Sequence, residues 1–195
     1  MINQSEITTK CKFLLGQWKD NLNLTNYERT KLEDTLNQLD FQINKLEKKE
    51  LQISVHGRVG VGKSSLLNAL IEKQIFPTDI INGNTKTSKS YKWEKRFQGL
   101  NKVELIDSPG IDEINNSNKE EINFNTVLDT DLILYVIDSD ITRVDMNSIE
   151  DLLRHNKPIL IVLNRCDQWN RRETKLILSS FIENYHFANK RLKLL

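Results

Sequence analysis

The most chemically specific segment of the chain is a phosphate-binding pattern. Residues 57–64 read Gly-Arg-Val-Gly-Val-Gly-Lys-Ser and satisfy G-x-x-x-x-G-K-[ST] at every required position. In such a loop the backbone N–H groups point inward and form a cradle for phosphate oxygens at the positive end of a helix. Lys63 would place its ammonium on the outer phosphates, and the Ser64 hydroxyl would ligate a nucleotide-bound magnesium ion. The predicted nucleotide-contacting residues of this segment are Gly57, Arg58, Val59, Gly60, Val61, Gly62, Lys63, Ser64 and Ser65.

This loop needs a strand before it and a helix after it, and the sequence predicts both. Residues 51–56 alternate apolar and polar side chains, as a half-buried strand does. Residues 64–73 place Leu66 and Leu70 with their apolar neighbours at the spacing of an amphipathic helix. A chance match with no nucleotide role is the alternative, and the flanking elements count against it.

From residue 51 onward, strand-like and helix-like segments alternate, which is typical of a mostly parallel sheet with helices on both faces. The predicted strands downstream of the loop are 103–106, 132–137 and 159–163. The last two are apolar enough to be buried on both faces. The predicted helices are 118–128, 146–155 and 171–185. The predicted fold class is therefore a three-layer α/β domain at residues 51–195.

The first fifty residues predict a separate helical hairpin. Ile7, Cys11, Leu14 and Trp18 share one helical face, and a polar interruption follows them. Thr25-Asn26-Tyr27-Glu28 has the form of a capping box, which predicts the start of a long helix. That helix carries about two heptad repeats, marked by Leu32, Leu36, Leu39, Ile43 and Leu46. The hairpin would pack on itself or on the following domain, or it would act as a dimerising or partner-binding coiled coil.

Composition excludes several classes of protein. The 28 basic and 27 acidic residues among 195 give a net charge of +1, so there is no basic footprint for DNA or another nucleic acid. Cys11 and Cys166 have neither disulfide nor metal-site spacing, which favours a reducing compartment. The chain starts without a signal-peptide pattern and has no apolar run long enough to span a bilayer. We expect a soluble, cytoplasmic protein, and peripheral membrane contact stays open.

Two further polar elements follow predicted strands. Asp107-Ser108-Pro109-Gly110 comes after one strand, and Asn164-Arg165-Cys166-Asp167 comes after another. Ligands of an open parallel sheet bind beyond the carboxyl ends of its strands. Together with the run from Gly57 to Leu70, these elements resemble the P-loop GTPases of the Era-like and dynamin-like branch, which includes the 50S ribosome-binding type. The resemblance covers residue 51 to about residue 195 and implies a P-loop NTPase fold.

The resemblance implies a magnesium site and a sensor for the third phosphate. Asp107 would hold Mg²⁺ through a water molecule, and the Gly110 N–H would meet the γ-phosphate of GTP. The switch threonine would be Thr85 or Thr87, and Thr85 stands at the family's usual distance from the loop lysine. The implied metal-binding set is Ser64, Thr85 and Asp107.

Asn164, Arg165 and Asp167 resemble the family's N-K-x-D signature for guanine. A carboxylate such as Asp167 can accept hydrogen bonds from both the ring N–H and the exocyclic amine of guanine. Adenine offers no matching donor pair, so the resemblance implies GTP and GDP as ligands rather than ATP. The family usually has lysine at the position of Arg165. An arginine plane can also lie along the base and brace the phosphate loop, which predicts altered affinity with guanine specificity retained.

The resemblance assigns catalytic roles to Lys63 and Thr85 and leaves the rate of hydrolysis open. Ras-like members orient the attacking water with a glutamine shortly after D-x-P-G, where this chain has Ile111. Gly60 replaces the asparagine of potassium-activated members. Arg58 either supplies a positive charge at the phosphates or points away from them. The leading hypothesis is a magnesium-dependent GTPase switch of low intrinsic rate; the alternatives are a GTP-binding interaction module with little hydrolysis and a P-loop ATPase.

Family members continue past the guanine signature with a helix, a strand whose Ser-Ala element touches the base, and a closing helix. Residues 171–185 can form that helix, and residues 191–195 can open that strand. The expectation is a G domain that lacks its last strand and helix. The family also implies a homodimer or a protein or ribosomal partner, contacted through the switch loops and the helical hairpin.

Overall fold

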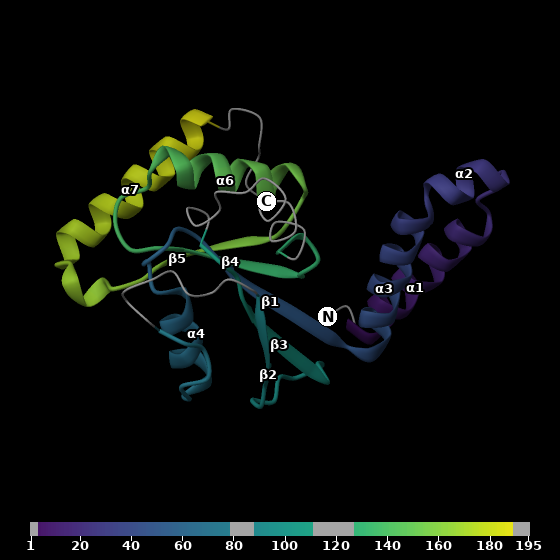
Figure 1. Ribbon diagram of the computed structural model, residues 1–195, viewed down its shortest axis with the longest axis horizontal. Helices are drawn as coiled ribbons and strands as arrows, with labels where there is room; N and C mark the ends of the chain where they lie inside the picture. The colour runs from purple at the N-terminus through teal and green to yellow at the C-terminus, as the bar shows by residue number, and fades with distance from the viewer. Residues whose placement is uncertain (1–3, 79–87, 111–126, 189–195) are drawn as a thin grey trace. The chain divides into compact units, whose positions relative to one another are not determined.

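The computed structural model describes residues 4–78, 88–110 and 127–188 (Figure 1). The chain divides into two compact units. One contains residues up to Leu51 together with Glu94–Val103, and the other contains Gln52–Trp93 and the residues from Glu104 onward. The sequence predicted a boundary after residue 50, and the structure divides the two units one residue later, after Leu51. The sequence did not predict that residues 94–103 belong to the N-terminal unit. The assignment of two functional domains stays a prediction.

The N-terminal unit contains the expected helical hairpin. Its helices are α1 (Gln4–Asp20), α2 (Asn26–Lys31) and α3 (Glu33–Lys48). Lys12 pairs with Glu47 and Lys19 with Asp40, so residue numbers rise along α1 while they fall along α3. The two helices therefore pack antiparallel. Asn101 adds to this unit by donating its backbone and side-chain N–H groups to carbonyls at the end of α3, each at 2.9 Å.

Two details of the hairpin differ from the sequence-based expectation. The capping box at Thr25 is present, with the Glu28 N–H 3.3 Å from the threonine oxygen, but the helix it starts is short. The backbone of Leu32 leaves helical geometry (φ −101°, ψ 4°) and separates α2 from α3. The predicted apolar face of α1 is also not its packed face, because Ile7, Leu14 and Trp18 are 45%, 53% and 56% exposed.

The second unit is built on a five-stranded, mostly parallel sheet of strand order β2-β3-β1-β4-β5. The strands are β1 (Glu50–His56), β2 (Lys89–Trp93), β3 (Lys102–Asp107), β4 (Leu132–Ile137) and β5 (Ile159–Leu163). Strand β4 runs parallel to β1, where His56 pairs with Tyr135, and parallel to β5, where Ile137 pairs with Leu163. The carboxyl ends of these three strands therefore meet at one edge of the sheet.

Alternate residues of β4 feed two separate cores. Leu134 and Val136 pack with α4 (Lys63–Ile71), whereas Ile133, Tyr135 and Ile137 pack with α6 (Arg143–Arg154). The two helices lie on opposite faces of the sheet (Figure 1). The predicted three-layer α/β architecture is thus confirmed. The last described helix is α7 (Arg171–Ala188).

The second unit differs from the sequence-based predictions at β2 and β5. Strand β2 was not predicted, although Tyr91 and Trp93 alternate with polar residues and pack against the α4 core. The prediction that 159–163 is buried on both faces is wrong, because β5 ends the described sheet and Leu160 is 55% exposed. The predicted helix at 118–128 lies largely outside the described residues, as does the predicted strand at 191–195.

Of the described helices, none combines the length and apolarity that crossing a membrane requires.

Candidate nucleotide-binding site

The phosphate-binding pattern forms the connection between β1 and the first turn of α4. Gly62 is the N-cap of α4 and has a positive φ of 89°, a conformation that side chains disfavour. A Cβ atom on Gly62 would lie 2.4 Å from the Asn164 side-chain nitrogen. That nitrogen donates to the carbonyl of Val61 at 2.9 Å. The loop is therefore shaped by the guanine signature as well as by its own glycines.

We expect Gly62→Ala to lower affinity for guanine nucleotide by about 10- to 100-fold, because it strains the loop and displaces Asn164. Titration with a fluorescent GDP derivative measures this effect. Gly16→Ala in α1 is the matched control, since a Cβ atom there meets nothing within 4 Å. Equal affinities of Gly62→Ala and wild type would contradict the packing of Asn164 on this loop.

The Lys63 ammonium lies inside the loop. It donates to the carbonyls of Gly57 at 2.9 Å and Arg58 at 2.7 Å, and the residue is 8% exposed. A buried ammonium at the N-terminus of a helix matches what phosphate oxygens need. The geometry thus agrees with a phosphate-contacting role for Lys63.

Ser64 and Asp107 make an oxygen-rich corner beside the loop. The Ser64 hydroxyl, in the first turn of α4, donates to the fully buried Asp107 carboxylate, at the end of β3, over 2.6 Å. Among the described residues, no three His, Cys, Asp or Glu side chains cluster as a metal cage. A hydroxyl beside one carboxylate suits Mg²⁺, which keeps several waters and uses few protein ligands. Thr85 and Thr87, the candidates for a third ligand, lie outside the described residues.

The Asp-x-Pro-Gly element lies directly against the phosphate loop. A Cβ atom on Gly110 would stand 2.5 Å from a methyl group of Val59 and 2.9 Å from its backbone nitrogen, so only glycine allows this approach. Ser108 ties the element to β1, because its hydroxyl donates to the carbonyl of Val55 at 2.5 Å. Gly110 is thus held directly against the phosphate loop at Val59.

The guanine signature follows β5 and reaches back to the phosphate loop. Arg165 adopts a positive φ of 55°, and its Nη2 donates to the carbonyl of Gly60 at 2.7 Å. Its Nη1 donates to a carboxylate oxygen of Asp138 at 3.0 Å. The Asp167 side chain is exposed in the following 3-10 turn, Cys166–Gln168. Asp167 is therefore accessible to a base, while Arg165 braces the loop as an arginine in place of lysine was expected to do.

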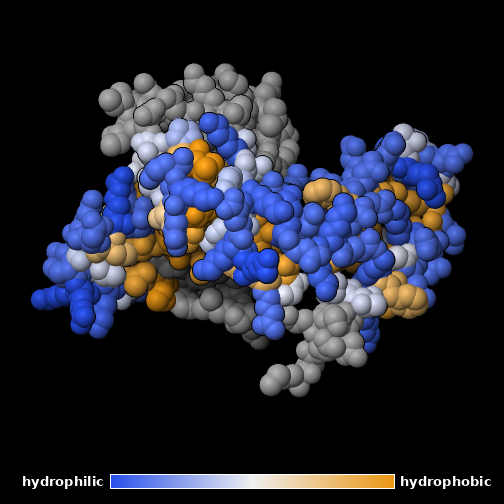
Figure 2. Space-filling view, turned by 90° about the horizontal axis from the view of Figure 1, so that it is seen from below, coloured by the Kyte–Doolittle hydropathy of each residue, from blue (hydrophilic) through white to orange (hydrophobic). Residues whose placement is uncertain are grey.

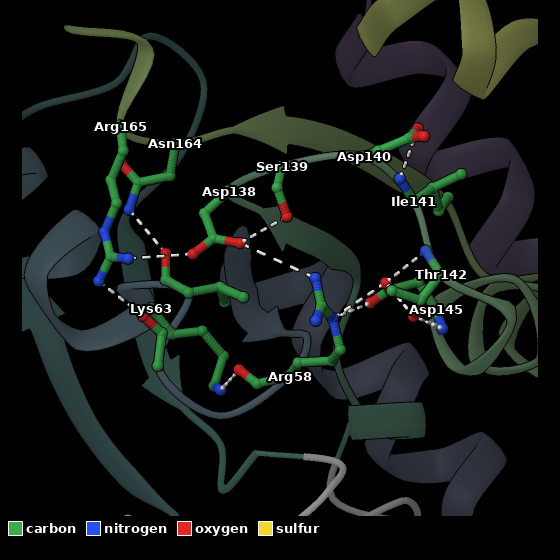
Figure 3. A network of polar contacts seen from close by, with 12 residues as sticks. Arg58, Lys63, Asp138, Ser139, Asp140, Ile141, Thr142, Asp145, Asn164 and Arg165 are labelled. Carbon is green, nitrogen blue, oxygen red and sulfur yellow. Dashed lines mark hydrogen bonds and ion pairs between the residues drawn. The ribbon is translucent and has the colours of Figure 1, made fainter. Parts of the chain in front are cut away.

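Arg58 does not present its guanidinium to the cradle. Its Nε lies 3.0 Å from the carboxylate of Asp145, which is fully buried, and its Nη2 lies 3.8 Å from Asp138 (Figure 3). Asp145 also accepts from the Thr142 N–H at 2.9 Å and the Tyr135 hydroxyl at 3.2 Å. Burial, followed by the nearby Asp145 charge, raises the pKa of Tyr135, so the phenol stays a donor. This geometry favours the alternative in which Arg58 points away from the phosphates.

Asp138 and Asp145 are the site residues that the sequence analysis missed. Asp138 directly follows the apolar strand β4, and Asp107 is the last residue of β3. Thr142 and Asp145 have the Ser/Thr-x-x-Asp spacing of a capping box, which the structure contains. The position of Asp138 after a strand and the capping-box spacing of Asp145 can both be read from the sequence. Neither pattern shows that these carboxylates lie next to Arg58.

His56 is a structural residue at the end of β1. Its Nδ1 lies 3.5 Å from the Ser108 hydroxyl, and its ring packs edge-on against Tyr135. Burial, and then the positive charge of Lys63, lowers the pKa of His56 to about 4. The imidazole is therefore neutral in the folded protein near pH 7, as a structural role requires.

This pKa predicts a loss of stability in mild acid. Unfolded His56 takes up a proton near pH 6.5, whereas the folded residue does so only near 4. The unfolded state thus binds more protons between these values, and the free energy of unfolding falls by about 3 kcal/mol as pH drops through this window. Denaturant unfolding of wild type and His56→Gln across the window measures the effect. A difference between the two proteins that does not change with pH would contradict the prediction.

The sheet order and the glycine-rich loop between β1 and α4 define a P-loop α/β domain. Residues 52–165 match the family described as 50S ribosome-binding GTPase, and the chain belongs to this family. The resemblance read from the three motifs is therefore confirmed at the family level.

Individual relatives agree with this assignment. GTPase Der of Campylobacter lari is 33% identical over 129 residues, which cover 64% of this chain and 27% of Der. GTPase Era of Thermoanaerobacter sp. strain X514 is 30% identical over 143 residues, which cover 70% of this chain and 46% of Era. A crystal structure of Era with MgGDPNP and part of 16S ribosomal RNA has the same fold, with a TM-score of 0.59 at 24% identity over 74% of this chain and 49% of that one. The chain spans less than half the length of each of these proteins.

Proposed function

We propose that the protein binds GTP and GDP with Mg²⁺ and hydrolyses GTP to GDP and phosphate at a low intrinsic rate. The observation that carries this proposal is the meeting of three groups of side chains at one edge of the sheet. The loop with Lys63 follows β1, Asp107 ends β3 beside Ser64, and the signature containing Asp167 follows β5. A phosphate-binding loop, a pair of oxygen ligands for a cation and a carboxylate that can bind a base together fit a nucleoside triphosphate.

Each group has a definite role in this proposal. Lys63 would exchange its two carbonyl partners for phosphate oxygens and neutralise their charge, and Asp167 would read guanine. Ser64 and Asp107 would hold Mg²⁺, which when bound supplies charge neutralisation at the phosphates. Gly110, packed on Val59, would report the third phosphate through its N–H.

The low rate is proposed because the described site has few groups for water activation. Arg58 is engaged with Asp145 and supplies no charge to the cradle. Ile111 stands where Ras-like members place a glutamine soon after the Asp-x-Pro-Gly element. Catalysis would then rest on positioning and on the charges of Lys63 and the metal site, with Thr85 proposed as a further contributor.

Single-turnover hydrolysis of GTP tests the proposal. The protein in excess over labelled GTP should release phosphate in the presence of Mg²⁺, and Lys63→Ala should reduce the rate to that of the solution reaction. Equal rates for wild type and Lys63→Ala would refute enzymatic hydrolysis. If the wild type binds GTP in a way that depends on Lys63 but releases no phosphate, the GTP-binding module is the correct alternative.

The interaction-module alternative has its own supporting observation. Large apolar side chains of the N-terminal unit are exposed to solvent, namely Phe13, Leu14, Trp18, Tyr27 and Phe41. Where such side chains form one contiguous patch, the patch is typical of a surface that binds a partner. The described contacts between α1 and α3 are made within one chain. Dimerisation through the hairpin is therefore a proposal.

Partner and location are also proposals. The Era structure contains 16S ribosomal RNA, which makes a ribosomal partner a reasonable hypothesis for this chain. The net charge of +1 argues against a broad electrostatic contact with RNA. A cytoplasmic location is proposed on the basis of the sequence alone.

A further inference from the structure

Asp138 occupies a position between the phosphate loop and the guanine signature. It is the first residue after β4, and its side chain is 20% exposed. One carboxylate oxygen accepts from Arg165 at 3.0 Å, and the other lies 3.8 Å from Arg58 (Figure 3). Its backbone carbonyl accepts from the indole N–H of Trp169 at 3.3 Å. Asp138 therefore contacts one residue of the phosphate loop and two residues in or next to the guanine signature.

These contacts form a chain of alternating charges in the order Asp145, Arg58, Asp138 and Arg165. Its inner end is fixed, because Asp145 is fully buried and holds Arg58 at 3.0 Å. Asp138 and Arg58 are also mostly sheltered, with side-chain exposures of 20% and 24%. Charge pairs with reduced solvent screening are stronger and better oriented than surface pairs.

The Arg165 guanidinium uses two nitrogens for two different partners. Nη1 donates to Asp138, and Nη2 donates to the carbonyl of Gly60 in the phosphate loop. A planar guanidinium can hold both directions at once, which a single ammonium nitrogen does less well. Asp138 thus sets the plane in which Arg165 reaches Gly60.

We propose that Asp138 is a positioning residue that keeps the guanine signature and the phosphate loop in the spacing one guanine nucleotide requires. It acts through Arg165 on one side and Arg58 on the other, without touching the ligand. This inference rests on the proposed nucleotide binding. It predicts that removing the Asp138 charge speeds nucleotide release even where the fold is intact.

The decisive measurement is the dissociation rate of a fluorescent GDP derivative, chased with excess GDP. Asp138→Asn should raise this rate about tenfold, the effect of losing one charge-assisted contact. Asp140→Asn is the matched control, since its carboxylate lies two residues away and bonds Ile141 and Ser180 rather than an arginine. It should change the rate less than about twofold.

A double-mutant cycle separates positioning from general destabilisation. Arg165→Met should also raise the rate about tenfold, and adding Asp138→Asn to it should raise the rate less than about threefold further. If the two substitutions raise the dissociation rate by factors that simply multiply, or if Asp138→Asn leaves the rate unchanged, the inference is overturned.

The Tm of Asp138→Asn without nucleotide should be close to that of the wild type. A large fall in Tm that accounts for the faster dissociation would also overturn the inference. Asp138→Ser is the second variant if Asp138→Asn does not fold.

The same data distinguish the two levels of the proposal. A wild-type protein that does not bind the fluorescent GDP, or binds it equally well as Lys63→Ala, refutes nucleotide binding at this site and this inference with it. Wild-type binding that depends on Lys63 but is indifferent to Asp138 refutes only the positioning role.

Discussion

Replacing Asp167 by asparagine is expected to lower the affinity for GDP by about 100-fold or more and to make XDP the preferred ligand. Guanine presents two donors, its ring N–H and its exocyclic amine, and a carboxylate can accept both. An asparagine amide would direct its own donor at the exocyclic amine. Xanthine carries a carbonyl at that position, which can accept from the amide. The Asp167 side chain is exposed, so the substitution should affect binding more than folding.

Competition against a fluorescent GDP derivative measures this switch. GDP, XDP and ADP are compared as competitors for wild type and Asp167→Asn. Asp151→Asn is a suitable control, because Asp151 is exposed on α6 and pairs with Arg154 of the same helix at 2.8 Å. Equal competition by GDP and ADP in the wild type would remove the guanine assignment and favour an adenine-nucleotide site.

Replacing Lys63 by alanine should lower GDP and GTP affinity by a factor on the order of 100 to 1,000. In the structure the ammonium is nearly buried and donates to the carbonyls of Gly57 and Arg58. Nucleotide binding would replace these neutral partners with charged phosphate oxygens, which is the stronger interaction. Without the ammonium, the phosphate charge would be met by backbone amides alone.

Equilibrium titration of the variant with fluorescent GDP checks this expectation. Lys175→Ala provides a control for the loss of a lysine, because Lys175 is exposed on α7. Thermal unfolding without nucleotide should shift by less than about 4 °C, since the removed charge was costly to bury. A variant that keeps wild-type affinity would mean that nucleotide, if bound, is not held by this loop.

The chain carries no large net charge that would attract nucleotides in general, because its 28 basic residues are nearly balanced by 27 acidic ones. Figure 2 shows hydrophilic residues interspersed with hydrophobic ones over the visible face of the molecule. Nucleotide affinity would therefore depend on specific groups such as Lys63 rather than on a general field.

The sequence alone predicted the α/β class, the helical hairpin and the family. These features follow from short-range information: alternation marks β1, and the capping box at Thr25 marks a helix start. The spacing of Gly57–Ser64, Asp107–Gly110 and Asn164–Asp167 added the family, because each motif meets a local geometric demand of a nucleotide.

Some local expectations failed because neighbouring structure decides them. The face that α1 presents to α3 carries ion pairs such as that of Lys12 with Glu47, and apolar periodicity does not reveal them. The apolar run 159–163 resembles a central strand, but burial also depends on what pairs beside it, and β5 ends the described sheet. Hydrophobic pattern reports a preference for burial and does not report position in a sheet.

What only the tertiary structure decided is how the three motifs connect. The strand order places the ends of β1, β4 and β5 side by side, which brings Asp138 between Arg58 and Arg165. The residue numbers of these three side chains differ widely, so no spacing rule could pair them. The sequence predicted which groups would bind phosphate and guanine, because those demands are local. The strand order and parallel register determined which carboxylates hold the two arginines, because strand pairing brings together residues that lie far apart in the chain.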